Sequence, residues 1–189
     1  MAAGRPRSEQ SRTAVLQATS ELMREVGLSA MTTDQIASRS GASKATIYKW
    51  WRNKYAVAVE AFLSELLAES PDPDTGSAVG DFKLVLRGVM KFYASDGGRV
   101  FAELVGQAQS DPTVEVELRD HLMQSRRDVG RAIWARGVAR GEVRADIDGE
   151  IALDLIFGPA MYRLVASRDA LDNASADAIV EAAMRGLAQ

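Results

Sequence analysis

The chain has 189 residues, of which 47% are hydrophobic and 26% are charged, so it is long enough for one substantial core or two small ones. It has no cysteine and a single histidine, which excludes disulfides and thiol catalysis and leaves no cysteine or histidine cluster to bind a metal. No apolar run reaches membrane length and no signal peptide opens the chain, so we expect a cytoplasmic protein without a cofactor.

The small net charge of -3 conceals an uneven distribution of charge along the chain. Residues 1–55 hold nine lysines and arginines against four acidic residues, a surplus of +5, so the remaining residues carry −8. A basic N-terminal part joined to an acidic body is typical of a phosphate-binding module attached to a domain that does not bind nucleic acid.

The first eleven residues form a polar segment in which arginines lie beside glycine and proline. Arg5 on such an arm can enter a narrow, A·T-rich minor groove, and the alternative is a frayed terminus. A first helix is expected at about residues 12–26, because Val15, Leu22 and Val26 form one apolar stripe and Gly27 then ends it.

Residues 32–54, TTDQIASRSGASKATIYKWWRNK, contain two short helices separated by a glycine turn. Thr32 can cap the first helix, and Gln35 can return the hydrogen bond as in a capping box. Gly41 tolerates the left-handed backbone needed where this helix ends, and Ser43 caps the second helix. This order of elements predicts a helix-turn-helix.

The second of these helices exposes hydroxyl, lysine and aromatic side chains, while Ile47 and Trp51 face inward. A recognition helix needs such donors near its N-terminal end, where free backbone N–H groups also attract phosphate. The alternative is an ordinary helical hairpin with a solvated basic face. We predict base-edge contacts from Ser43, Lys44, Thr46 and Lys49, and phosphate contacts from Thr33, Tyr48, Trp50 and Lys54.

The same stretch resembles the DNA-binding signature of the tetracycline-repressor (TetR) family of bacterial regulators. The matching residues are Thr33, Ile36, Ala37, Gly41, Ser43, Lys44, Thr46, Ile47, Tyr48, Trp51 and Lys54. Ser40 and Ala42 replace the usual alanine and valine, and Trp50 with Trp51 replaces a pair of smaller aromatic rings. The resemblance covers the N-terminal third and implies an operator-binding head on a dimeric body.

Helical periodicity continues through the rest of the chain, and no segment alternates as a strand does. The expected elements are helices at about 54–68, 82–93, 100–108 and 112–140, with a loop at 71–76. Gly97 and Gly98 close the second of these helices. Asp111 and Pro112 open the last one, which is about 40 Å long and ends at Gly141.

The eighth expected helix, at about 151–166 behind the cap Asp148, is apolar nearly all the way round and must be covered on two sides. Pro159 should loosen its hydrogen bonding near Leu155. With a final helix at about 175–187 it is the natural seam of a homodimer, as the resemblance also implies, and the alternative is a packed monomeric core. The predicted seam residues are Leu155, Tyr162, Ile179, Ala183 and Leu187.

Large or flexible apolar side chains on several helices are candidates for lining a ligand cavity, with a few polar groups to orient the ligand. Each of them alone is more often part of an ordinary core. The candidates are Phe62, Met90, Phe101, Leu104, Trp134, Phe157 and Met161, with Tyr93, Gln107, His121 and Tyr162 as polar groups.

We therefore expect an all-α protein of about nine helices, with a DNA-binding domain at 1–54 and an effector-binding and dimerisation domain at 55–189. The predicted function is that of a homodimeric repressor that a small apolar ligand releases from a palindromic, double-stranded operator. The alternative is a constitutive DNA-binding protein without an effector. An enzyme is not expected, because the carboxylates have no cysteine or histidine partner. The effector, the operator sequence, the target genes and the sign of regulation do not follow from the sequence.

Overall fold

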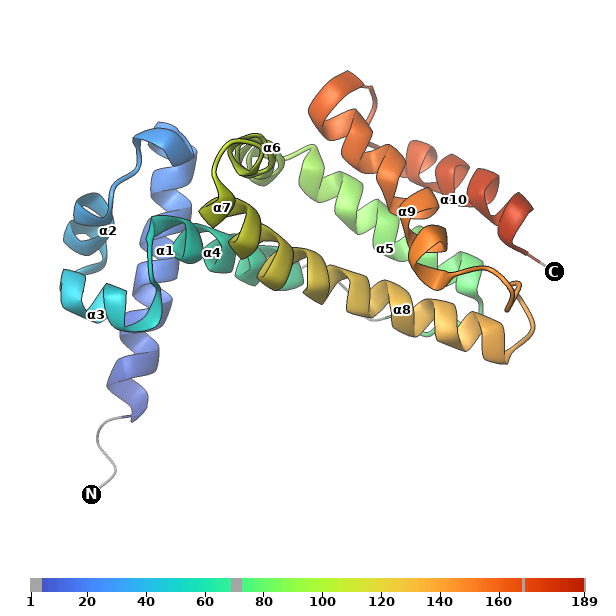
Figure 1. The fold of residues 1–189 in the computed structure, drawn as a ribbon, viewed down its shortest axis with the longest axis horizontal. Coiled ribbons are helices and arrows are strands. Elements are labelled where there is room, and N and C mark those ends of the chain that lie inside the picture. Colours follow the sequence, from blue (N-terminus) through green and yellow to red (C-terminus); the bar gives the residue numbers. More distant parts are fainter. Residues whose placement is uncertain (1–4, 69–72, 168, 189) are drawn as a thin grey trace. The chain divides into compact units, whose positions relative to one another are not determined.

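The computed structural model describes residues 5–68, 73–167 and 169–188, and helices make up most of this part of the chain (Figure 1). The all-α prediction is confirmed, with ten α-helices rather than about nine among the described residues. They are α1 Arg5–Ala30, α2 Thr33–Ser40, α3 Lys44–Trp50, α4 Lys54–Ala68, α5 Ala78–Tyr93, α6 Asp96–Ala108, α7 Pro112–Glu117, α8 Gln124–Ala139, α9 Gly149–Tyr162 and α10 Asn173–Leu187. Two π-helical turns, η1 Leu118–Met123 and η2 Arg163–Ser167, follow α7 and α9.

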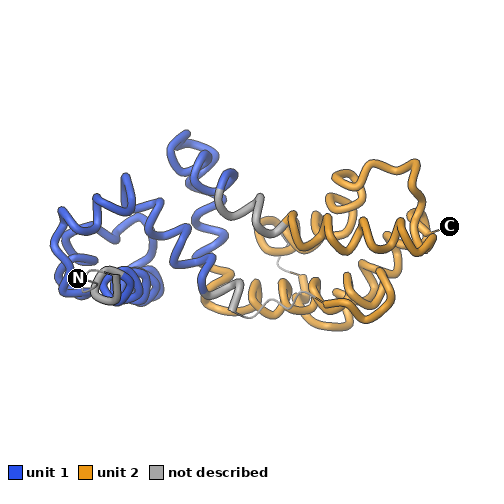
Figure 2. The backbone as a smooth tube through the Cα atoms, turned by 90° about the horizontal axis from the view of Figure 1, so that it is seen from below, with its two compact units in different colours: residues 1–65, 100–122 blue, residues 66–99, 123–189 orange. Residues whose placement is uncertain are grey.

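The chain divides into two compact units, which Figure 2 shows in different colours. Unit 1 comprises residues 1–65 and 100–122, and unit 2 comprises residues 66–99 and 123–189. Because α4 ends at Ala68, it begins in unit 1 and finishes in unit 2. The domains predicted at 1–54 and 55–189 were separated by function, as a DNA-binding domain and an effector-binding domain, whereas the two units are separated by packing. The functional domains stay a prediction.

The first helix begins earlier than the sequence pattern predicts. Residues 5–11 are the first turns of α1 and not part of an arm, and Pro6 is tolerated there because the first turn of a helix leaves its N–H groups unbonded in any case. The predicted break at Gly27 is confirmed by its φ of 79°, although the helix resumes and runs to Ala30. The arm residues 1–4 lie outside the described residues.

The boundary between α5 and α6 also differs from the prediction. Gly97 and Gly98 lie in the first turn of α6 and do not close α5. A Cβ atom on Gly98 would come 2.0 Å from the carbonyl oxygen of Tyr93, so glycine is required where α6 starts against the end of α5. Gly98 therefore does not mark the end of a helix. Glycine is found there because the backbone of α6 approaches the backbone of α5 closely.

The long seventh helix of the prediction is interrupted. Asp111 caps it as expected by accepting from the backbone N–H of Thr113 at 2.9 Å, but the π-helical turn η1 separates α7 from α8. The predicted cap Asp148 likewise accepts from the N–H of Glu150 at 2.8 Å. From that cap, α9 continues through Pro159 to Tyr162 and then widens into η2.

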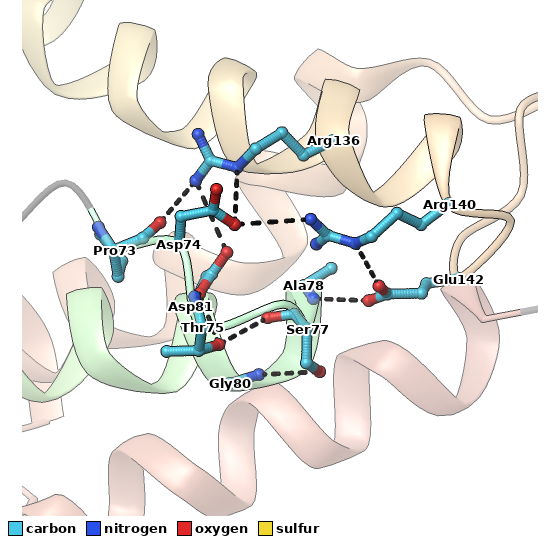
Figure 3. A network of polar contacts seen from close by, with 10 residues as sticks. All are labelled: Pro73, Asp74, Thr75, Ser77, Ala78, Gly80, Asp81, Arg136, Arg140 and Glu142. Atoms are coloured by element: carbon cyan, nitrogen blue, oxygen red, sulfur yellow. Dashed lines mark hydrogen bonds and ion pairs between the residues drawn. The ribbon is translucent and has the colours of Figure 1, made fainter.

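A polar network inside unit 2 ties the segment before α5 to α5 itself and to α8 (Figure 3). Asp81 is completely buried and accepts from the hydroxyl of Thr75 at 2.6 Å and from its backbone N–H at 2.8 Å. Arg136 donates to the carbonyl of Pro73 at 2.5 Å and lies 3.5 Å from Asp81. The buried carboxylate thereby holds the segment before α5 in place, while Ser77 caps α5 by accepting from the N–H of Gly80.

Candidate DNA-binding site

Side-chain caps fix the two helices of the predicted helix-turn-helix. The hydroxyl of Thr32 accepts from the N–H of Gln35 at 3.2 Å, and the Gln35 side chain accepts from the N–H of Thr32 at 2.8 Å, which confirms the capping box. Gly41 ends α2 in the left-handed conformation, with a φ of 68°. Ser43 caps α3 by accepting from the N–H of Thr46 at 3.1 Å.

The recognition helix α3 leaves nearly all its side chains at the surface of unit 1. Ile47 is its buried residue, and Trp51, the residue after it, is 3% exposed. The exposed members of the predicted contact set are Ser43, Lys44, Tyr48, Lys49 and Trp50, while Thr33, Thr46 and Lys54 are half-buried. Such a surface on a short capped helix can reach base edges and phosphates.

Three of the four predicted base contacts are bonded to neighbouring side chains in the free protein. The hydroxyls of Ser43 and Thr46 lie 2.8 Å apart and hydrogen-bond to one another. Lys44 pairs with Asp34 of α2 at 2.5 Å, and this hydrogen bond with its ion pair raises the pKa of the Lys44 ammonium. Lys44 is therefore a cation at neutral pH, and its orientation is set by α2 before DNA arrives.

Lys54 is bonded to the backbone of the protein itself, and its predicted phosphate contact stays a prediction. Its ammonium donates to three backbone carbonyls, those of Leu28 at 3.1 Å, Ser29 at 3.1 Å and Met31 at 2.9 Å. An ammonium has three protons, so these bonds use all of its donors. These bonds hold Lys54 against the turn between α1 and α2, where burial lowers the pKa of its ammonium.

Several polar residues that support α3 carried no signal in the sequence. Glu60 of α4 accepts from the indole N–H of Trp51 at 2.7 Å and pairs with Arg12 of α1 at 2.5 Å. Arg52, two residues after the end of α3, forms an ion pair with Glu117 of α7, whose side chain is 3% exposed. These partners are far apart in the chain, and no motif spacing relates them.

The predicted ligand residues are distributed over both units. In unit 1, Phe62 and Phe101 are buried and stacked, with ring centroids 5.0 Å apart, and Leu104 is buried as well. In unit 2, Met90, Tyr93 and Trp134 are buried, and Phe157 and Met161 are half-buried. A shared cavity stays a prediction. The side chains of Arg5 and His121 lie outside the described residues.

The predicted seam helix α9 does have two apolar faces. Ala152, Leu153, Ile156 and Ala160 are buried in unit 2. The opposite face is exposed and apolar: Ile151 is 56% exposed, Leu155 52%, Tyr162 62% and, in η2, Val165 49%. Gly158 lies on the exposed face, where it allows a second helix to approach closely.

The last helix requires one correction. Leu187 is 2% exposed and belongs with Val180 and Met184 to the buried face of α10, so its side chain is core and not seam. Ile179 and Ala183 are half-buried. Each directly precedes a residue of the buried face, so they lie at the edge of that face. The stripe chosen from the sequence thus mixed two faces at its C-terminal end.

A capped helix, a left-handed glycine turn and an exposed second helix with basic and hydroxyl side chains define a helix-turn-helix DNA-binding protein. Two family models match this chain, "Bacterial regulatory proteins, tetR family" over residues 15–61 and "Tetracyclin repressor-like, C-terminal domain" over residues 72–183. The chain belongs to the TetR family of transcriptional regulators. It is accordingly a DNA-binding regulator and not an enzyme.

Individual relatives agree with this assignment. The HTH-type transcriptional regulator YdeS of Bacillus subtilis (strain 168) is 40% identical over 184 residues, which is 97% of this chain and 93% of YdeS. The tetracycline repressor protein class A from transposon 1721 of Escherichia coli is 29% identical over 182 residues, 88% of this chain and 83% of the repressor. The crystal structure of the TetR family transcription regulator SCO0332 superposes with a TM-score of 0.83 at 30% identity, covering 94% of this chain and 98% of that one.

Within the described residues, no helix is both long and apolar enough to cross a membrane.

Proposed function

We propose that the protein acts in the cytoplasm as a homodimeric repressor, which a small apolar ligand releases from a palindromic operator. The observation that carries the dimer is the exposed apolar face of α9, which comprises Ile151, Leu155, Tyr162 and, in the following turn, Val165. Apolar side chains gathered on one face opposite a buried face are typical of a helix that packs against a second chain. A relative that is named a repressor supports the sense of regulation.

In a dimer, each head places α3 in one half of the operator. Half-sites one helical turn apart lie about 34–36 Å from centre to centre, so the operator selects one separation of the two recognition helices. Ser43, Lys44, Thr46 and Lys49 serve as the base-edge contacts, and Thr33, Tyr48 and Trp50 serve as phosphate contacts.

Ligand control is proposed to pass along α4. This helix carries Phe62, stacked on Phe101, in unit 1 and continues into unit 2, while its first residue Lys54 is bonded to the turn before α2. A ligand that moves α4 would change the separation of the recognition helices. It can shift the equilibrium only by its differential affinity for the two forms, and allosteric couplings are typically about 1–3 kcal/mol.

The experiment has two steps. Thermal-shift screening with small apolar compounds identifies a ligand by the stabilisation it gives to the folded protein. The ligand is then titrated with and without the operator duplex that the protein selects from a random pool. The proposal requires the operator to weaken ligand binding by the same factor by which the ligand weakens operator binding. Equal ligand affinities in the two titrations would leave a constitutive DNA-binding protein.

A further inference from the structure

A four-residue cluster in unit 1 surrounds the C-terminal end of the recognition helix. Glu60 of α4 accepts from the indole Nε1–H of Trp51 at 2.7 Å, and its other carboxylate oxygen lies 2.5 Å from a guanidinium nitrogen of Arg12. The same guanidinium lies 5.8 Å from the ring centroid of Trp50. Side chains from α1 and α4 thus contact Trp50, the last residue of α3, and Trp51, which follows it.

The recognition helix has few other contacts that fix its orientation. It is seven residues long, and Ile47 is its one buried side chain among the described residues. Besides an exposed ion pair from Lys44 to Asp34 of α2, which contributes little, the helix is held by one apolar residue and by the following Trp51. It can therefore rotate about its own axis at little cost, because apolar contacts are not directional. A hydrogen bond is directional and opposes such a rotation.

The donor side of the hydrogen bond to Glu60 is buried, while the Glu60 side chain itself is 31% exposed. Trp51 is 3% exposed, and the Oε1 atom of Glu60, which faces Arg12, is shut off from solvent. A hydrogen bond to a charged acceptor is stronger than one between neutral groups. Loss of the carboxylate would leave the buried indole N–H without this acceptor.

We propose that Glu60 is a positioning residue for operator recognition, which sets the orientation of α3 through the indole of Trp51. The inference rests on the DNA-binding half of the proposed function and does not depend on a ligand. Glu60 contacts no base. It acts by holding the exposed donors of α3, Lys49 among them, in the orientation in which they meet base edges.

A purely electrostatic role for Glu60 and a positioning role predict opposite effects of Glu60→Ala on operator binding. Glu60→Ala removes one negative charge close to the basic N-terminal residues 1–55 and releases Arg12, and both changes favour phosphate binding. A purely electrostatic role therefore predicts tighter binding to any DNA. A positioning role predicts weaker binding to the operator alone, since only base contacts require the correct orientation of α3.

The test compares two duplexes of equal length and composition, the sequence that the wild-type protein selects from a random pool and a scrambled version of it. We expect Glu60→Ala and Trp51→Phe each to weaken operator binding about tenfold, the value of one hydrogen bond to a charged group. Binding to the scrambled duplex should stay equal or become tighter. The double variant should lose no more than either single one, because both changes remove the same bond.

Glu60→Gln keeps an oxygen that can accept from the indole and should restore operator selectivity to within about threefold of wild type. Glu9→Ala, which removes an exposed carboxylate from α1, is the control for charge and should leave the selectivity unchanged. Binding is measured well below the unfolding midpoint, with the active fraction of each variant determined by stoichiometric titration.

Equal losses on both duplexes, or a gain on both, would overturn the proposal, and so would a Glu60→Gln variant as unselective as Glu60→Ala. If the wild-type protein itself does not distinguish the two duplexes, the proposed repressor function fails first.

Discussion

The Nζ atom of Lys54 lies 2.9 Å from the carbonyl oxygen of Met31, and two more carbonyls of the same turn complete its hydrogen bonding. The first residue of α4 therefore closes the turn through which α1 leads into α2. From the sequence, a lysine next to the helix-turn-helix is predicted to contact phosphate. The structure turns its charge inward, toward the exposed carbonyls where α1 ends.

We predict that Lys54→Met lowers the free energy of unfolding by about 1–3 kcal/mol, because three carbonyls lose a charged donor. The salt dependence of operator binding should keep its slope. Urea denaturation and operator titrations at several salt concentrations measure the two quantities. A phosphate contact would give the reverse result, with unchanged stability and a slope reduced by about one. Lys49→Met, at an exposed lysine of α3, is the control and should change stability by less than about 0.5 kcal/mol.

Local signals in the sequence predicted the parts of the site that depend on near neighbours. The caps Thr32, Ser43 and Asp148 and the left-handed Gly41 were all predicted, because a cap bonds to a backbone group two or three residues away. Residue type and spacing alone determine such bonds.

Contacts between distant residues were not predictable in this way. Glu60 meets Arg12 across 48 positions, and Arg52 meets Glu117 across 65. The chain has other glutamates on helices, and nothing in the nearby sequence distinguishes them from Glu60 and Glu117. Only the packed fold determines which carboxylate meets which arginine. For the same reason, the sequence pattern groups Leu187 with Ile179 and Ala183 in the seam, although the packing of unit 2 buries the Leu187 side chain.

The buried network around Asp81 should contribute strongly to the stability of unit 2. Burial alone would raise the pKa of Asp81, but hydrogen bonds from the hydroxyl and N–H of Thr75, with Arg136, outweigh it and lower the pKa. Asp81→Ala removes the common acceptor of these groups, and we expect a loss of about 2–4 kcal/mol in calorimetric or denaturant unfolding. Asp74→Ala is the matched control. Its carboxylate is 65% exposed, so removing it should cost less than about 1 kcal/mol, and an equal loss at both positions would contradict the network's importance.

Acid should weaken the connection between α8 and α9. Hydrogen bonds from Arg131 at 2.6 Å and from Arg127 at 2.7 Å lower the pKa of Glu150 from 4.5 to about 2. A carboxyl whose pKa is depressed by folding contributes stability above its unfolded pKa and loses that contribution as the pH falls through the folded value. The contribution of Glu150 is therefore complete above about pH 5 and is lost between pH 4.5 and about 2.

The variant Glu150→Gln has no carboxyl to titrate, so its unfolding free energy should fall less steeply than that of the wild type over this range. Denaturant unfolding at closely spaced pH values gives both slopes, and NMR titration of the Glu150 carboxyl gives its pKa directly. Parallel slopes for the two proteins, or a midpoint near 4.5, would show that the arginines do not hold this carboxylate.

The exposed face of α9 makes the most direct prediction about assembly. Leu155 is 52% exposed and lies between Ile151 and Gly158 on that face, so Leu155→Glu would place a charge in the middle of the proposed seam without touching the buried face. A charge buried without a partner is costly, and the dimer should separate into monomers in light scattering or sedimentation at micromolar concentration. Operator affinity should then fall by about 100-fold or more, because each half-site is bound alone, while thermal stability of the isolated chain changes little. Leu84→Glu, at another exposed leucine of unit 2, is the control and should remain dimeric. A wild-type protein that is monomeric at these concentrations, or a Leu155→Glu variant that stays dimeric, would show that a different surface joins the two chains.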